Sequence, residues 1–138
     1  MAGYSGTPLV KKLGFKSGFR AGLVNSPPGF QTELVQLPDN VSLAVHKLDK
    51  QLDLIVLFVD SQQALNRDFS KLARKLVENG MLWIAWPKKA SGVVTDLSEG
   101  IVRNIGLEAG LVDVKVCAIN DVWSGLKFVY RIKDRKTR

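Results

Sequence analysis

Short apolar segments alternate with turn-forming residues along most of this chain, and their periods separate strands from helices. The segment 52–59, LDLIVLFV, is almost continuously apolar, as expected for a strand that is buried on both faces of a parallel sheet. The segment 81–86, MLWIAW, has the same character and stops at Pro87. Apolar side chains spaced by two residues predict another strand over 41–47 with one buried face.

Two longer segments have helical periodicity. Apolar side chains recur at helical spacing after Ser61, which predicts a helix from that N-cap to about Glu78, before an Asn-Gly turn. A second helix is predicted after Asp96, because Glu99 follows three residues later as in a capping box. That helix is expected to end at Gly110.

Shorter elements complete the pattern. They are a helix over 8–13, a strand over 19–24, one or two helical turns over 31–36, and strands over 111–119 and 126–132. The last two strands are separated by only six residues, too few for a parallel crossover, so they are expected to pair antiparallel. Asp113 and Lys115 place charges on one face of the earlier strand, as at the exposed edge of a sheet.

This order of elements predicts an α/β protein. We expect a three-layer α/β/α sandwich around a mostly parallel six-stranded sheet that ends in an antiparallel strand pair. The 138 residues suit one domain with a real core. Residues 1–130 are assigned to this domain, and 131–138 to the end of the last strand and a basic tail. A flavodoxin-like sheet is the rival architecture, but such sheets end in a helix and this chain does not.

The formal net charge is +7 at pH 7, and much of it lies at the carboxyl terminus. The last eight residues, RIKDRKTR, contain five cations and one acid, a net charge of +4, which leaves +3 for the other 130 residues. Such a terminus is typical of a solvated, frayed tail. Contact of the tail with nucleic acid or another polyanion is the alternative.

Composition excludes several classes of protein. No apolar run approaches the roughly 18 residues of a membrane span, and the amino terminus lacks the long apolar segment of a signal peptide. The single cysteine, Cys117, allows no internal disulfide and no cysteine-based zinc site. We therefore expect a cytoplasmic protein without membrane contact and without a bound metal.

Ligands of parallel sheets bind at the carboxyl ends of the strands, where the strand order reverses. We expect that point to lie between the strands 19–24 and 52–59. Four loops meet at this edge of the sheet. The candidate ligand-binding residues in them are Asn25, Ser26, Gly29, Asp60, Lys88, Lys89, Ser91, Trp123 and Ser124.

The loop after the segment 81–86 is basic, and two interpretations of it stay open. Lys88 and Lys89, with Ser91 beside them, suit a phosphate or a carboxylate. The loop lacks the glycine spacing of a phosphate-binding loop, so a solvated basic loop is the alternative. Trp123, beside Ser124, is placed either to stack on a ring or to pack under a neighbouring loop.

The remaining candidates also have structural alternatives. Asn25 and Ser26 either contact a ligand or cap the backbone of their own turn. Asp60 either caps the next helix or contacts a ligand as a polar group or base. The only histidine, His46, is expected to be half-exposed and structural, and Cys117 to fill space in a strand. With one histidine in a remote strand, no catalytic triad can be assembled, and no catalytic residue is predicted.

Three segments resemble a small bacterial single-domain family of unknown function. They are YSGTPLVKKLGFKSGFRAGLVNSPPGF, WIAWPKKASGVVTDLSEGIVRN and GLVDVKVCAINDVWSGLKFVYR. The resemblance covers nearly the whole chain and implies a small bacterial protein of one domain. It implies no activity and no catalytic residues.

The order of elements resembles the Rossmann-like fold of methyltransferases that use S-adenosylmethionine (SAM), with one early strand–helix unit missing. The resemblance implies that the last strand lies inside the sheet and that 111–119 lies at its edge. It also implies a SAM site with a glycine-rich loop after the first strand and an acidic residue after the second, near Asp49. The loop LVNSPPGF at 23–30 has no G-x-G, and its prolines remove backbone donors. This argues against SAM in the usual pose, and no cofactor is predicted.

These features leave the function open. The favoured interpretation is a non-catalytic Rossmann-like module that binds a small anionic ligand or a protein partner at the carboxyl ends of the strands. A methyltransferase-like transferase with an atypical cofactor site is one alternative. Nucleic-acid binding through Lys88, Lys89, the basic helix face over 67–75 and the tail is the other.

Overall fold

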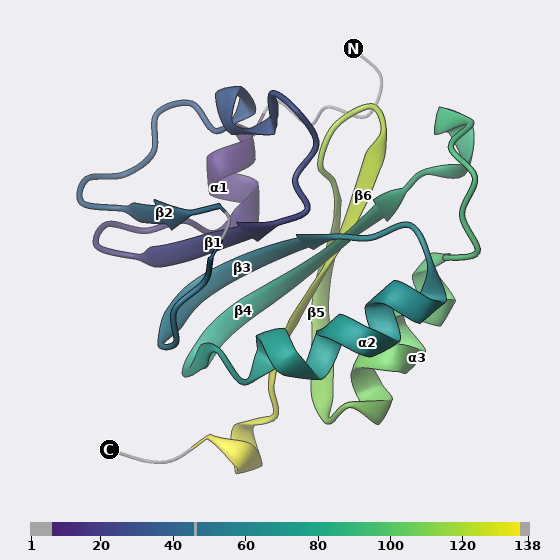
Figure 1. Ribbon diagram of the computed structural model, residues 1–138. Coiled ribbons are helices and arrows are strands. Elements are labelled where there is room, and N and C mark those ends of the chain that lie inside the picture. Colours follow the sequence, from purple (N-terminus) through teal and green to yellow (C-terminus); the bar gives the residue numbers. More distant parts are fainter. Residues whose placement is uncertain (1–6, 46, 136–138) are drawn as a thin grey trace.

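The computed structural model describes residues 7–45 and 47–135, which form one six-stranded sheet in the order β2-β1-β3-β4-β6-β5 (Figure 1). The first four strands are parallel, and β6 is antiparallel to both β4 and β5. The predicted mostly parallel sheet that ends in an antiparallel pair is therefore confirmed. Its strands are β1 (Arg20–Val24), β2 (Ser42–Ala44), β3 (Leu52–Phe58), β4 (Leu76–Pro87), β5 (Leu111–Ala118) and β6 (Trp123–Tyr130).

Helices cover both faces of the sheet. The helices α2 (Gln62–Ala73) and α3 (Glu99–Glu108) lie on the front face in Figure 1. The short helix α1 (Leu9–Leu13) and a 3-10 turn at Phe30–Glu33 lie on the other face. Two further 3-10 turns are Lys89–Ser91 and Ile132–Asp134. The α/β/α sandwich follows from these layers.

The strand β3 is buried on both faces, as its apolar run predicts. Ile55 and Leu57 belong to the core under α2 and α3, whereas Leu54, Val56 and Phe58 belong to the core on the α1 side. Successive side chains of a strand point to opposite faces, so one apolar run serves two cores. Trp83 of β4 is likewise fully buried, as predicted, and its indole N–H donates to the carbonyl of Leu13 (2.9 Å).

The helix α2 ends five residues earlier than its periodicity predicts. The backbone N–H of Leu52 donates to the carbonyl of Lys75 (2.8 Å), and Leu76 pairs with Leu52 as the first residue of β4. Leu76 is buried, so the strand satisfies the same apolar position that the helix would have used. The Asn-Gly turn falls inside β4, where the register with β3 shifts, and it does not close a helix.

The predicted capping box at Asp96 is wrong. Ser98 is the N-cap of α3, and its hydroxyl accepts from the N–H of Ile101 (3.4 Å). The carboxylate of Asp96 instead accepts from the N–H of Gln62 (2.8 Å), at the first turn of α2. Thr95 fixes this contact, because its hydroxyl donates to the carbonyl of Asp60 (2.7 Å).

The edge strand β5 carries its charges on two faces, whereas the sequence predicts one. Asp113 lies opposite Phe128, and Lys115 lies opposite the adjacent residue Lys127. Val114 is therefore an extra residue on β5 and forms a bulge. Asp113 therefore turns toward α3, where it pairs with Arg103 (2.9 Å). The predicted place of β5 at the edge of the sheet is confirmed.

A short link replaces the missing strand–helix unit. The described residues of this link, 45 and 47–51, lie between the end of β2 and the start of β3, and β3 pairs with β1 on the side opposite to β2. Leu48 of this link packs directly on Gly22 of β1, where a Cβ would lie 2.5 Å from a Leu48 methyl group. The predictions for His46 fall outside the described residues.

The contact between α3 and the sheet can be tested with two glycines of the same helix. A Cβ at Gly106 would collide with the ring of Phe128, which is fully buried. We expect Gly106→Ala to lower the free energy of unfolding by about 1–3 kcal/mol. Gly100 faces open space, so Gly100→Ala should leave stability unchanged or raise it by up to about 1 kcal/mol. Urea denaturation measures the stability of both variants. Equal unfolding midpoints for the two would show that α3 packs against Phe128 more loosely than the structure indicates.

Candidate functional site

The strand order reverses between β1 and β3. The strand β1 pairs with β2 on one side and with β3 on the other, so the chain leaves β1 in one direction and later returns to its opposite side. Their carboxyl ends, at Val24 and Phe58, lie at one edge of the sheet. This is the edge at which parallel sheets bind ligands, and it is the edge expected from the sequence.

The loop after β1 is a rigid turn. The N–H of Phe30 donates to the carbonyl of Pro27 (3.0 Å), and Gly29 has φ 83° and ψ −4°. These values fit a type II turn with Pro28 and Gly29 at its centre. Neither proline has an N–H, so this turn lacks the donors with which a glycine-rich loop cradles a nucleotide. Gly29 serves the turn itself.

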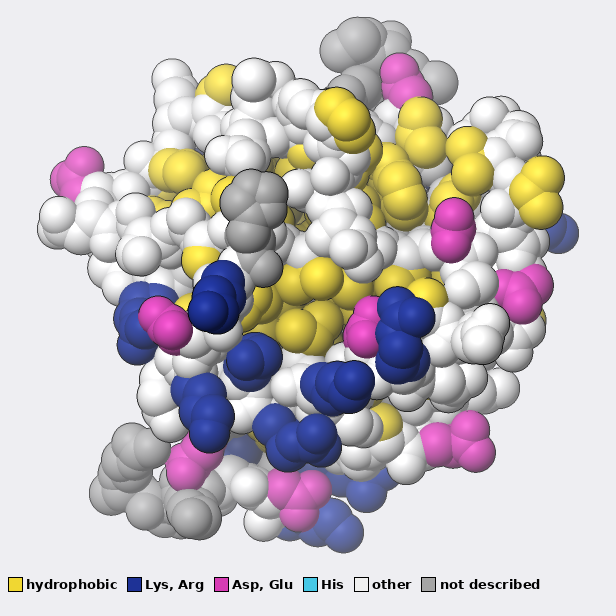
Figure 2. Space-filling model, viewed as in Figure 1, with side chains coloured by type: hydrophobic (Ala, Val, Ile, Leu, Met, Phe, Trp, Pro, Cys, Tyr) yellow, Lys and Arg dark blue, Asp and Glu magenta, His cyan; other side chains and the backbone are white. Residues whose placement is uncertain are grey.

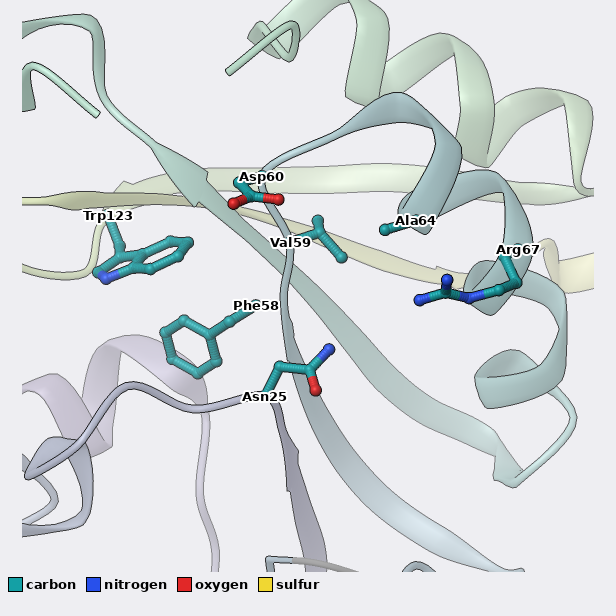
Figure 3. A pocket seen from close by; sticks show the side chains of 7 residues that line it. All are labelled: Asn25, Phe58, Val59, Asp60, Ala64, Arg67 and Trp123. Atoms are coloured by element: carbon teal, nitrogen blue, oxygen red, sulfur yellow. The ribbon is translucent and has the colours of Figure 1, made fainter. Parts of the chain in front are cut away.

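A pocket of about 320 Å³ opens beside this turn (Figure 3). The rings of Phe58 and Trp123 form one side of it and meet edge to face, with 5.0 Å between their centroids. Ala64 and Arg67 of α2 form the other side. The complete lining is Asn25, Phe58, Val59, Asp60, Ala64, Arg67 and Trp123. Trp123 thus lines a pocket, and it is also the first residue of β6.

Two of the predicted polar residues, Asn25 and Asp60, lie in this pocket. Neither side chain has a hydrogen bond or an ion pair to any residue in the described part of the chain. Asn25 has φ 58°, a left-handed conformation that asparagine tolerates. Asp60 does not cap α2, because Ser61 does so by accepting from the N–H of Ala64 (3.1 Å). The structural alternatives for these two residues are therefore wrong, and both side chains are available to a ligand.

Four lining residues were not predicted from the sequence, and Arg67 is the only charged one among them. Its guanidinium binds both carboxylate oxygens of Asp68 (3.1 and 3.2 Å), while 61% of its side chain stays exposed. The hydrogen bond to Asp68 raises the pKa of Arg67, so the side chain keeps its charge. Arg67 follows Ala64 by three residues, and that spacing on α2 is the signal that they share a face.

The amino end of α2 is already occupied. The amides of Gln62 and Ala64 donate to Asp96 and Ser61, respectively. A helix amino terminus attracts anions, and here a carboxylate of the chain itself takes that place. These two amides are therefore not available to a ligand in the pocket.

The basic loop after β4 does not contribute to the pocket lining. The hydroxyl of Ser91 donates to the carbonyl of Lys88 (2.6 Å) and accepts from the N–H of Val93 (3.1 Å), so it stabilises its own turn. Lys88 and Lys89 are not among the lining residues. Ser124 lies within β6, opposite Trp86 of β4.

Ser26 lines a second hollow, of about 310 Å³, which adjoins the first through Asn25. Val24 and Val45 complete its lining. Asp49, the position nearest to a ribose-binding acid, lies elsewhere. Its carboxylate is 3.9 Å from Arg20, the first residue of β1, and therefore at the amino end of the strands. The short link brings residue 49 back to that edge.

The other candidate chemical groups are structural. Cys117 is half-buried and packs on the core of the α1 side. Among the described residues, no group of three or more histidine, cysteine, aspartate or glutamate side chains is arranged to hold a metal ion. No helix in that part of the chain is long and apolar enough to cross a bilayer.

Solved structures with the same arrangement exist. A SAM-dependent methyltransferase from Aquifex aeolicus superposes with a TM-score of 0.63 at 16% identity, over 87% of this chain and 86% of that one. This chain has a methyltransferase-like α/β fold. The ribosomal protein L11 methylase of Lactobacillus delbrueckii subsp. bulgaricus gives a TM-score of 0.63 at 14% identity, over 89% of this chain and 75% of that one. Magnesium protoporphyrin IX methyltransferase from Synechocystis, with bound SAM, gives 0.59 at 10% identity, over 89% and 74%.

These similarities concern the fold alone, because the identities are low. No family model and no curated protein matches the chain. The predicted methyltransferase-like topology is confirmed, with β6 inside the sheet and β5 at its edge. The resemblance to a bacterial family of unknown function stays a prediction.

The chemistry of Cys117 gives a test of its structural role. Burial raises the pKa of the Cys117 thiol, so the reactive thiolate forms only at higher pH in the folded protein. We expect labelling by iodoacetamide at pH 8 to be at least tenfold slower in the folded chain than in urea. Folding stability depends on the same ionisation. The contribution of the protonated thiol to stability is complete below the pKa of the unfolded thiol, and it is lost as the pH rises through the higher pKa of the folded thiol.

An exposed thiol in the same protein is the control for this reaction. Asp121 is exposed, and its side chain has no hydrogen bond or ion pair among the described residues, so Asp121→Cys in a Cys117→Ala background should react quickly with and without urea. Fast labelling of Cys117 in the folded chain would contradict its assignment as a packed side chain.

Proposed function

We propose that this protein binds a small ligand with an anionic group in the pocket at the carboxyl ends of β1 and β3. We also propose that it does not catalyse methyl transfer. One observation carries the proposal. Asn25, Asp60 and Arg67 converge on a pocket with an aromatic side, and the first two have no partner within the described part of the chain. Unpartnered polar side chains that converge in a concave site are what a ligand would satisfy.

The lining residues indicate the chemistry of the ligand. Arg67 and the amide of Asn25 are donors suited to a carboxylate or a phosphate. Asp60 is an acceptor, which favours an amino or hydroxyl group elsewhere on the same molecule. Phe58 and Trp123 supply an apolar wall. A volume of about 320 Å³ is at the small end for ligand sites. A carboxylate carried by a protein partner would use the same contacts.

The lining residues favour binding without catalysis. Asp60 and Arg67 are the only ionisable side chains in the lining. General acid–base catalysis needs a group within hydrogen-bond reach of the proton that it moves, and nucleophilic catalysis needs a nucleophile with an adjacent base. The lining contains no serine, cysteine, histidine or lysine.

A methyltransferase-like transferase is the second candidate. Its support is the position of the pocket at the reversal of strand order and the fold shared with methyltransferases. The prolines of the turn and the position of Asp49 at the opposite edge argue against SAM in its usual pose. Asp60 is the side chain that would hold the substrate or the cofactor in an atypical pose.

Titration followed by NMR and calorimetry distinguishes these candidates. L-methionine, inorganic phosphate, SAM and S-adenosylhomocysteine are the probes. We expect L-methionine or phosphate to shift the backbone signal of Asn25 and the indole signal of Trp123. Arg67→Ala should weaken that binding about tenfold or more, since a hydrogen bond to a charged group contributes roughly 1.5–3 kcal/mol. Asn66→Ala, an exposed neighbour on α2, is the matched control.

The alternative outcomes are distinct. Micromolar binding of SAM and S-adenosylhomocysteine, weakened by Asp60→Asn, would favour the transferase over the binding module. Unshifted Asn25 and Trp123 signals with all four probes at millimolar concentration would contradict a small-ligand site at this edge.

A further inference from the structure

A basic groove of about 630 Å³ lies at the other end of α2 from the pocket. The residues that line this basic groove are Lys50, Lys71, Arg74, Lys75 and Tyr130. Its volume is about twice that of the pocket, and its lining contains no acid. Figure 2 shows Lys and Arg side chains gathered in a band across the lower half of the face that carries α2.

Three parts of the chain build the basic groove. The last turn of α2 and the residues just after it supply Lys71, Arg74 and Lys75. The short link before β3 supplies Lys50, so the missing strand–helix unit is what brings this lysine beside α2. Tyr130 ends β6 and anchors the wall, because its hydroxyl donates to the carbonyl of Ala73 (2.5 Å).

Most of these cations are not neutralised by the protein. Lys75 donates to the carbonyl of Leu48 (3.1 Å), which fixes its position but leaves its charge. Lys50, Lys71 and Arg74 have no hydrogen bond or ion pair to any side chain in residues 7–45 and 47–135. The nearest acid on α2, Asp68, is paired with Arg67. Like charges gathered around one concavity attract a polyanion.

We propose that the basic groove binds the phosphate backbone of a nucleic-acid strand. Lys71 and Arg74 are separated by about 4.5 Å along the axis of α2, at about 1.5 Å per residue, and Lys50 lies in another segment of the groove lining, so the cations can contact neighbouring phosphates. A membrane surface fits less well, because a basic helix on a bilayer inserts an apolar face. Here the apolar side chains of α2, Leu65, Phe69 and Leu72, are buried in the core.

The basic groove uses part of the helix face 67–75 that the sequence suggested, through Lys71, Arg74 and Lys75, and it adds Lys50. Lys88 and Lys89 lie in the loop that follows the carboxyl end of β4, and neither lines the basic groove. In the tail, Arg131 donates to the carbonyl of Leu107 (3.4 Å) and Arg135 to the carbonyl of Tyr130 (3.0 Å). The described part of the tail therefore folds back onto the domain, and Arg135 is brought to the margin of the groove.

Salt-dependent binding of a 20-nucleotide oligo-uridine RNA tests the proposal by fluorescence anisotropy. We expect the triple variant Lys50→Ala, Lys71→Ala, Arg74→Ala to weaken binding at least tenfold at low salt. It should also reduce the slope of log K against log salt by about 2, at about 0.7 for each lost phosphate contact on a single strand. The matched control, Lys11→Ala, Lys88→Ala, Lys89→Ala, removes the same charge elsewhere and should change binding less than threefold.

Other outcomes would overturn the proposal. Equal losses in the two triple variants would show only a general charge effect. Sedimentation of the protein with phosphatidylserine vesicles, without binding of the RNA, would assign the groove to membranes. Displacement of the RNA by inorganic phosphate at the same concentration as the RNA phosphate groups would assign the groove to a single small anion. Circular dichroism and thermal unfolding check that the variants fold. Because the basic groove shares no lining residue with the pocket, failure of either proposal leaves the other intact.

Discussion

Both candidate sites depend on the burial of β3 between two apolar layers. Its side chains alternate between the core under α2 and α3 and the core on the α1 side, and six of its seven residues are buried. Each such side chain contributes roughly 1.5–3 kcal/mol when it leaves water. This strand ends in the pocket at Phe58, Asp60 follows two residues later, and the strand begins two residues after Lys50 of the basic groove. The two surfaces are therefore held at opposite ends of the most buried element of the fold.

The short link before β3 determines how this chain differs from a longer methyltransferase fold. It crosses from β2 to the far side of β1 without a helix, and it can do so closely because Gly22 has no side chain under Leu48. The same link carries Asp49 to the amino end of the strands and leaves the second hollow beside Ser26 open. The link thus places Asp49 away from the pocket and Lys50 in the basic groove.

The distribution of unsatisfied polar groups separates structure from potential function. In the described part of the chain, no buried side-chain nitrogen or oxygen lacks a hydrogen-bond partner. The amino end of α2 is satisfied by Asp96 and Ser61, and the basic loop is stabilised by Ser91. Among the polar side chains that have no hydrogen bond or ion pair within the described residues, Asn25 and Asp60 line the pocket, and Lys50, Lys71 and Arg74 line the basic groove. Because the buried polar groups have hydrogen-bond partners within the protein, the pocket and the basic groove are the places where a ligand would supply partners.

Local sequence patterns determined the strands, their burial and the closing antiparallel pair, because side-chain period and loop length act within a few residues. They also located the edge at which β1 and β3 end, and with it Asn25, Asp60 and Trp123. Only the tertiary structure decided the end of α2, since Lys75 is bound to Leu52 across the sheet. The same is true of Asp96, which caps a helix 34 residues away, and of Arg67 and Lys50, which enter their sites through packing. Backbone hydrogen bonds and contacts between distant residues override local propensity, and no period along the chain encodes them.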